Sequence, residues 1–220
     1  MEMEILMGEV VPFRAPKCEI RKATKPVNPK LRYLVRGSKP KNRVREYLTE
    51  QEVKRIIDSI KGPRTGQRDK LMIWLMYRHG YRASEICNAL WTSVDFKNAR
   101  IHVKRLKGSD DAVHPLSGDE LRALRRWQRH QPVQSAYIFT AWSAAPLHRR
   151  TLYCIVRDAG RRANIGIDVY PHILRHSCGT ALAQKGVDLR VIQAFLGHRS
   201  VQNTVRYTKL SPKQFETIWD

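Results

Sequence analysis

The stretch His172-Ile-Leu-Arg175, followed by Leu196-Gly-His198 and then by Tyr207, is the most informative part of this chain. His172 and Arg175 are three positions apart, which places both side chains on one face of a helix. Tyr207 follows His198 after nine positions. Polar side chains at these intervals do not form the apolar repeat of a packed helix. The pattern therefore predicts an active site, with Tyr207 as its candidate nucleophile.

Two upstream segments contribute further cationic candidates. Gly80-Tyr-Arg82-Ala-Ser-Glu85 supplies a second arginine, which follows a glycine expected to end a helix. Arg82 then lies at a bend, and Glu85 is expected to hold its guanidinium group from behind. Lys107-Gly108 supplies a lysine in the predicted turn of a β-hairpin.

The charge balance points to a polyanionic partner. The chain has 220 residues, with 41 Lys+Arg against 20 Asp+Glu and a formal net charge of +21. Nucleic acid is the leading candidate, and a merely soluble basic protein is the alternative. No run approaches the roughly 20 apolar residues of a membrane span. The acidic first residues lack the basic-then-apolar order of a signal peptide, so a cytoplasmic, nucleoid-associated location is expected.

The cysteines are scattered along the chain, with no C-x-x-C spacing: Cys18, Cys87, Cys154 and Cys178. Reduced and mostly buried thiols are the expected state. The sequence predicts no metal site, no disulfide framework and no cofactor.

Residues 1–45 are predicted to form a basic, proline-containing arm that is extended or disordered. Residues 12–45 hold twelve Lys/Arg, one acid and five prolines. Such a composition buries too little apolar surface to fold alone. The arm is interpreted either as a segment that follows DNA phosphates or as a solvated tail.

Residues 46–220 are predicted to form one mainly α-helical domain with a small antiparallel β-hairpin. Capping boxes open helices at Thr49 and Ser117. Strands are expected at 100–104 and 112–116. The other predicted helices cover 67–79, 84–90, 149–163, 173–185, 189–196, 200–207 and 212–219.

Cleavage of a phosphodiester needs cations on the phosphate, a nucleophile, and a proton for the leaving oxygen. Arg82 and Arg175 suit the phosphate because a guanidinium binds it through two hydrogen bonds and stays charged. His198 is a further candidate donor. A phenol has a pKa of about 10, so Tyr207 is expected to need neighbouring cations that stabilise its anion. Lys107 is the candidate general acid for the leaving oxygen.

Each candidate also has an ordinary structural explanation when it is taken alone. A single arginine or lysine is commonly a solvated surface charge, and a single histidine or tyrosine commonly packs in the fold. His176, next to Arg175, is expected to point away from the site and to be structural.

Taken together, these residues resemble the catalytic domain of the tyrosine recombinases, the phage-integrase and Xer family. The resemblance extends from about Leu48 to Trp219. The segments His79-Gly-Tyr-Arg-Ala-Ser-Glu-Ile-Cys, Arg105-Leu-Lys-Gly and Val113-His-Pro-Leu are most similar to the fimbrial phase-switch invertases. The resemblance implies site-specific DNA strand exchange through a 3′-phosphotyrosyl intermediate. Its implied catalytic residues are Arg82, Lys107, His172, Arg175, His198 and Tyr207, with Glu85 behind them.

The resemblance also implies a homo-tetramer on paired double-stranded DNA sites. Most family members carry a helical core-binding domain ahead of the catalytic domain, whereas here a basic arm precedes it. Accessory DNA-bending proteins are therefore possible partners. Two other functions stay open: nicking and sealing like a type IB topoisomerase, and DNA-binding regulation without catalysis.

Overall fold

The computed structural model describes residues 45–62, 65–105 and 110–207, which form eight α-helices and one three-stranded antiparallel sheet. The predicted fold class, mainly helical with a small antiparallel sheet, is confirmed. Most of the predicted arm lies outside the described residues, as do Lys107 and the predicted helix 212–219. Within the described part of the chain, no helix is both long enough and apolar enough to cross a membrane.

Helix α1 (Glu50–Ser59) begins at the predicted capping box. The Glu52 carboxylate accepts a 2.9 Å hydrogen bond from the backbone N–H of Thr49, and the Thr49 hydroxyl accepts one from the N–H of Glu52. Just ahead, the backbone N–H of Leu48 donates to Ser177 Oγ at 2.7 Å. Ser177 belongs to α6 (Pro171–Gln184), so this bond ties the start of the domain to the helix that carries His172 and Arg175.

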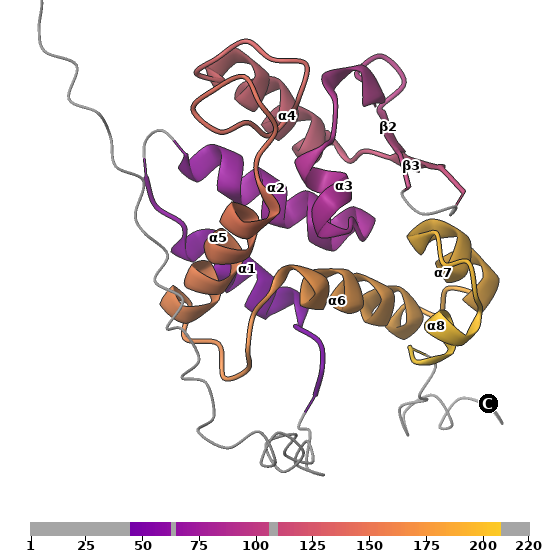
Figure 1. The fold of residues 1–220 in the computed structure, drawn as a ribbon. Helices are drawn as coiled ribbons and strands as arrows, with labels where there is room; N and C mark the ends of the chain where they lie inside the picture. The colour runs from indigo at the N-terminus through magenta and orange to yellow at the C-terminus, as the bar shows by residue number, and fades with distance from the viewer. Residues whose placement is uncertain (1–44, 63–64, 106–109, 208–220) are drawn as a thin grey trace, which may run out of the picture. The chain divides into compact units, whose positions relative to one another are not determined.

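Helices α2 (Gly66–His79) and α6 pack against each other at the centre of the domain, and α1 and α5 (Arg149–Arg162) pack together beside them (Figure 1). The middle of α2 is apolar on several sides, as a helix surrounded by others requires. Its buried side chains include Leu71, Met72, Ile73, Leu75 and Met76. The predicted buried helix 67–79 is therefore confirmed.

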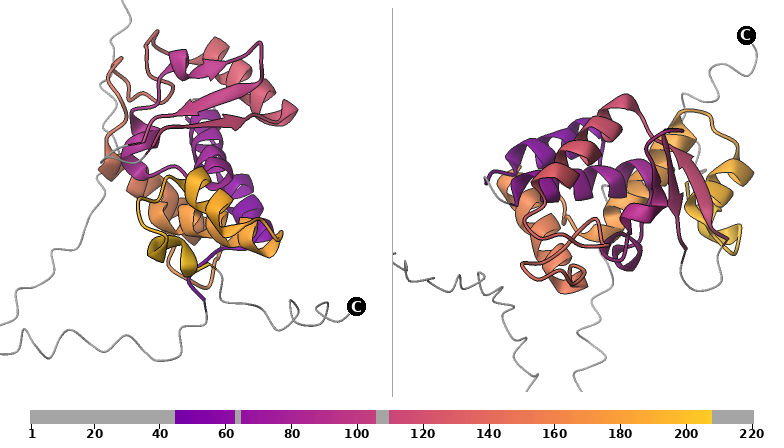
Figure 2. Two further views of the ribbon diagram at one scale, coloured as in Figure 1. Left: turned by 90° about the vertical axis from the view of Figure 1, so that its right-hand side faces the viewer. Right: turned by 90° about the horizontal axis from the view of Figure 1, so that it is seen from above.

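The sheet has the order β1-β2-β3, with strands Val94–Asp95, Arg100–Val103 and Ala112–Pro115. Ile101 pairs with His114 in the β2–β3 hairpin. Strand β1 was not predicted, because two residues are too few to show an alternating pattern. The hairpin lies beside α7 (Leu189–Leu196) in the views of Figures 1 and 2.

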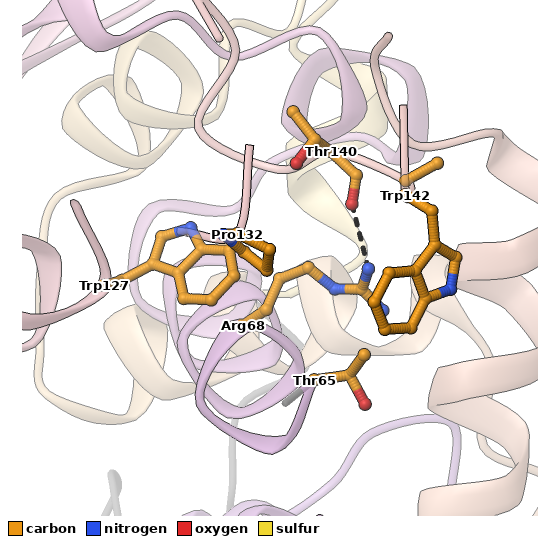
Figure 3. A pocket seen from close by; sticks show the side chains of 7 residues that line it. Thr65, Arg68, Trp127, Pro132, Thr140 and Trp142 are labelled. Carbon is orange, nitrogen blue, oxygen red and sulfur yellow. Dashed lines mark hydrogen bonds between the residues drawn. The ribbon is translucent and has the colours of Figure 1, made fainter. Parts of the chain in front are cut away.

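Helix α4 (Gly118–His130) also begins at its predicted capping box, and a long loop then returns to α5. Arg68 of α2 anchors this loop by donating to the Thr140 carbonyl at 2.9 Å, beside Trp127 and Trp142 (Figure 3). The cavity between them has a volume of about 10 Å³, room for about one water molecule. This region supports the fold and lies apart from the predicted catalytic residues.

Two predicted helices are shorter in the structure. Helix α3 ends at Cys87 rather than Leu90, because Leu90 leaves the helix to form a β-bridge with Tyr137. Helix α8 covers only Gln202–Val205, so Tyr207 follows the helix in a turn. The other predicted elements that fall within the described residues agree with the structure to within two residues.

Candidate active site

Arg82 is held at the bend between α2 and α3 (Ala83–Cys87). Gly80 ends α2 in the left-handed conformation, with φ of 60°. The Glu85 carboxylate accepts from the backbone N–H of Arg82 at 2.9 Å and from its Nη1 at 2.6 Å. Burial alone would raise the pKa of Glu85, but the Arg82 backbone bond and the charge of Arg105 lower it instead. Glu85 is therefore ionised and fixes the direction of the Arg82 guanidinium.

Three arginines from different elements cap the last carbonyl groups of α7. Nη2 of Arg105 donates to Phe195 at 2.6 Å, Nη2 of Arg175 to Leu196 at 2.5 Å, and Nη2 of Arg82 to Gly197 at 3.1 Å. The final carbonyls of a helix have no partners within the helix, and its C-terminus carries partial negative charge. These contacts fix the corner from which the chain continues to His198.

Arg105 was not among the predicted site residues, and it connects the others. Its side chain is fully buried, and its Nη1 lies 2.8 Å from Glu85 Oε2. Arg105 and Arg175 also share the Gly80 carbonyl, at 3.3 and 2.5 Å. The sequence does indicate that the Arg105 side chain points inward. Arg105 continues the alternation of buried Ile101 and Val103 along β2, which places its side chain inward.

We expect Arg105→Lys to slow DNA cleavage more than it weakens DNA binding. One ammonium group can pair with Glu85, but it cannot also reach the Phe195 carbonyl, so the α7 corner loses a buried partner. Leaving such a group unpaired costs about 1–3 kcal/mol of unfolding free energy. Single-turnover cleavage and urea unfolding measure the loss of rate and the loss of stability, and a gel-shift titration measures DNA binding.

The matched control is Arg122→Lys, because Arg122 pairs with Asp119 on the exposed face of α4. An exposed ion pair contributes little to stability, so this control should change neither quantity. Equal behaviour of the two variants would contradict the role given to Arg105.

Arg175 is the most enclosed of the predicted residues, with 1 % of its surface exposed. Burial lowers the pKa of Arg175 to about 10, and the charges of Arg82 and Arg105 act in the same direction. The guanidinium thus stays charged at neutral pH. Arg82 is more accessible, with 28 % of its side chain exposed.

Tyr207 packs its ring directly on the backbone of α6. A Cβ atom added at Gly179 would lie 2.7 Å from two ring carbons of Tyr207, so only glycine permits this approach. The residue is 8 % exposed and shares a small apolar cluster with Cys178, Ile192 and Leu196. Its ring is therefore fixed, and its hydroxyl meets the Nδ1 atom of His176 at 3.0 Å.

The expectation that His176 points away from the site was wrong. His172 and His176 are four residues apart on α6, which is the spacing that places two side chains on one helix face. Their rings lie edge to face, with centroids 4.3 Å apart. Burial lowers the pKa of His176 to about 4, and His172 and Arg206 add to this effect. His176 is consequently neutral at physiological pH.

His198 lies beside Tyr207, and His172 lies beside His176. The Nδ1 atom of His198 pairs with Thr204 Oγ1 at 2.9 Å, and its ring is nearly parallel to that of Tyr207 with centroids 6.2 Å apart. Burial lowers the pKa of His198 to about 4, assisted by Arg175. Burial and Arg175 also lower the pKa of His172. All of the predicted site residues within the described part of the chain therefore lie around the junction of α6, α7 and the α2–α3 bend.

Tyr207 has neighbouring cations that favour its anion, namely Arg175 and Arg206. Burial nevertheless raises the pKa of Tyr207 by more than these arginines lower it. Without DNA, Tyr207 is thus a protonated phenol. A cleft of about 590 Å³ between β3 and α7 opens beside His198.

Comparison with known proteins identifies the family of this chain. Residues 46–214 match the phage integrase family. The type 1 fimbriae regulatory protein FimE of Escherichia coli K12 is 39% identical over 181 residues, which cover 80% of this chain and 91% of FimE. The crystal structure of XerA recombinase has a TM-score of 0.68 at 29% identity, covering 79% of this chain and 63% of XerA. A pre-cleavage complex of the XerH site-specific recombinase with its difH substrate has a TM-score of 0.69 at 25% identity, covering 80% of this chain and 55% of XerH.

The chain belongs to the phage integrase family, that is, the tyrosine recombinases. It is a site-specific DNA recombinase, and its similarity to the fimbrial phase-switch invertases is confirmed.

Proposed function

We propose that Tyr207 attacks the scissile phosphate, with Arg82, Arg175, His172 and His198 around it, and that the recombination is an inversion. The observation that carries this proposal is the placement of the Tyr207 hydroxyl. It lies at His176, beside the histidines and arginines of the α6–α7 junction. The fimbrial resemblance, with FimE as a relative over 91% of its length, supports inversion.

In this mechanism the phenolic oxygen of Tyr207 bonds to phosphorus while the bond from phosphorus to the 5′ oxygen breaks. The product is a 3′-phosphotyrosine, which keeps the energy of the phosphodiester and allows rejoining without ATP. Arg82 and Arg175 stabilise the charge that builds on the phosphate oxygens. Lys107 protonates the leaving 5′ oxygen. His172 and His198 lie around the phosphate with the two arginines.

A nicked suicide substrate tests this assignment against the two other functions. The nick lets the 5′ fragment diffuse away, so the covalent protein–DNA adduct accumulates. We expect an adduct at Tyr207 and, on intact two-site DNA, an inverted product. Relaxation of supercoils without recombinants would indicate a topoisomerase-like activity. Binding without an adduct would indicate a regulator.

The proposal assigns the predicted arm, residues 1–45, to contacts with DNA phosphates. Deletion of the arm should weaken DNA affinity and flatten its dependence on salt, because each lost phosphate contact removes about 0.9 from the slope of log K against log salt. Titrations at several salt concentrations measure the slope. A full-length variant with the arm's Lys and Arg changed to Gln is the matched control for length, and it should behave like the deletion. An unchanged slope in both would make the arm a solvated tail.

The proposal also includes a homo-tetramer on paired DNA sites, held by the predicted helix 212–219. Phe215, Ile218 and Trp219 lie on one face of that helix by their spacing. About eight residues do not hold a helix in water alone, so this face needs a docking surface. We assign the cleft between β3 and α7 of a neighbouring protomer, where Val113 and Val191 are 52% and 55% exposed.

Truncation after Ser211 should therefore leave binding to one DNA site largely intact but prevent synapsis and recombination. Sedimentation of the protein on two-site DNA measures assembly. Val191→Asp, which changes the proposed docking cleft, should likewise prevent synapsis and recombination while binding to one DNA site is retained. A truncated protein that still forms tetramers and recombines would contradict the assignment.

Because DNA is the substrate, we place the enzyme in the cytoplasm on nucleoid DNA. Accessory DNA-bending proteins are proposed as partners that help to align the paired sites. Recombination on linear two-site DNA with the purified enzyme alone would argue against such a requirement.

A further inference from the structure

The Tyr207 hydroxyl has a defined hydrogen-bond partner before DNA arrives. His176 Nδ1 lies 3.0 Å from this oxygen, while the contact with Gly179 prevents the ring from shifting toward α6. His198 lies alongside the ring and uses its own Nδ1 on Thr204. Of these two histidines, His176 is the one placed at the reacting atom.

We propose that His176 is the general base that removes the phenolic proton of Tyr207 when Tyr207 attacks the scissile phosphate. This inference rests on the proposed function of Tyr207 and names the group that activates it. His176 would contact the reacting oxygen itself, so it would be a catalytic residue rather than a support for the helix.

The proposed role requires one particular tautomer of His176. Nδ1 must accept the phenolic hydrogen, so Nε2 must carry the ring proton. Arg206 Nη1 lies near Nε2, but at 3.5 Å, and Arg206 also faces Glu46 at 4.0 Å. The Tyr207 contact fits either tautomer, because a hydroxyl can donate or accept, so the proposed role places the ring proton on Nε2 and requires the exposed Arg206 side chain to turn from Nε2 toward Glu46.

The surrounding charges keep His176 in its basic form. Burial lowers the pKa of His176 to about 4, and His172, Arg206 and Arg175 act in the same direction, so His176 is neutral at physiological pH. A bound phosphate brings negative charge to the arginines among these neighbours. It offsets their effect on His176 and makes the imidazole a better base at the moment of attack.

The proton balance is complete within the proposed site. The phenolic O–H bond breaks, its proton moves to Nδ1, and the phenolic oxygen bonds to phosphorus. The bond to the 5′ oxygen breaks, and Lys107 supplies the proton of that leaving group. During rejoining each proton returns, so His176 acts as a general acid toward the tyrosine oxygen.

Single-turnover cleavage of two nicked substrates tests the assignment. One substrate carries the normal phosphodiester, and the other has sulfur in place of the 5′ bridging oxygen, which makes a leaving group that needs no acid. His176→Ala should slow cleavage of both by about 10²-fold or more, with DNA affinity retained. Lys107→Ala should be slow only on the oxygen substrate. The rate of His176→Ala should rise about tenfold per pH unit, since hydroxide must replace the base.

Two further variants separate proton transfer from simple positioning. His176→Asn can accept a hydrogen bond but not a proton, so it should stay slow. His130→Ala, at the exposed end of α4, should match the parent. The assignment is overturned if His176→Ala cleaves within a few-fold of the parent, if His176→Asn restores the parental rate, or if sulfur rescues His176→Ala. Absence of a Tyr207-dependent adduct from the parent itself would instead overturn the proposed function.

Discussion

Tyr207→Phe is expected to abolish the covalent protein–DNA adduct and recombination while DNA binding is retained. The substitution removes only the phenolic oxygen. The ring still packs on Gly179 and within the cluster of Cys178, Ile192 and Leu196, so the fold should persist. Denaturing gel electrophoresis after incubation with nicked DNA measures the adduct, and a gel-shift titration measures binding.

Tyr153→Phe is the matched control for this prediction. Tyr153 lies on α5 with 47 % of its surface exposed, and it takes no part in the proposed chemistry. The control should form the adduct at the parental rate. An SDS-resistant adduct formed by Tyr207→Phe would show that another residue is the nucleophile.

The sequence predicted the fold well where local signals were strong. Thr49 with Glu52 and Ser117 with Glu120 place their helices because each capping box satisfies backbone groups within four residues. Gly80 and Gly197 end their helices in the left-handed conformation for the same local reason. Strand β1 depends on pairing with β2, so two residues of local sequence did not reveal it.

The site was harder to predict where a role depends on distant partners. Arg105 and His176 both had a local signal, namely strand alternation and four-residue helix spacing. However, neither pattern shows which distant residue the side chain contacts. Arg105 meets Phe195 across 90 positions and His176 meets Tyr207 across 31. The sequence likewise shows which cations could act on Tyr207, but it does not show how deeply the phenol is buried, and burial raises its pKa.

Arg82→Lys and Arg175→Lys are each expected to reduce cleavage by about 10²-fold or more although the positive charge is kept. A lysine offers one point charge, whereas the guanidinium binds through two planar groups at once. The structure distinguishes the two changes by their cost in stability. At Arg82, a lysine still reaches the buried Glu85 carboxylate but loses the Gly197 carbonyl. The Arg82 side chain is partly exposed, so water can replace the lost donor and unfolding should change little.

At Arg175, the two terminal nitrogens bind the carbonyls of Gly80 and Leu196, and the residue is 1 % exposed. A lysine satisfies one of them and leaves the other buried and unpaired, which costs about 1–3 kcal/mol of unfolding free energy. Arg175→Lys should therefore lose both cleavage and stability, and Arg82→Lys cleavage alone. Single-turnover rates with urea unfolding curves separate the two cases. Cleavage within a few-fold of the parent would remove either arginine from the site, and equal unfolding curves would show that the α7 corner does not need the second Arg175 contact.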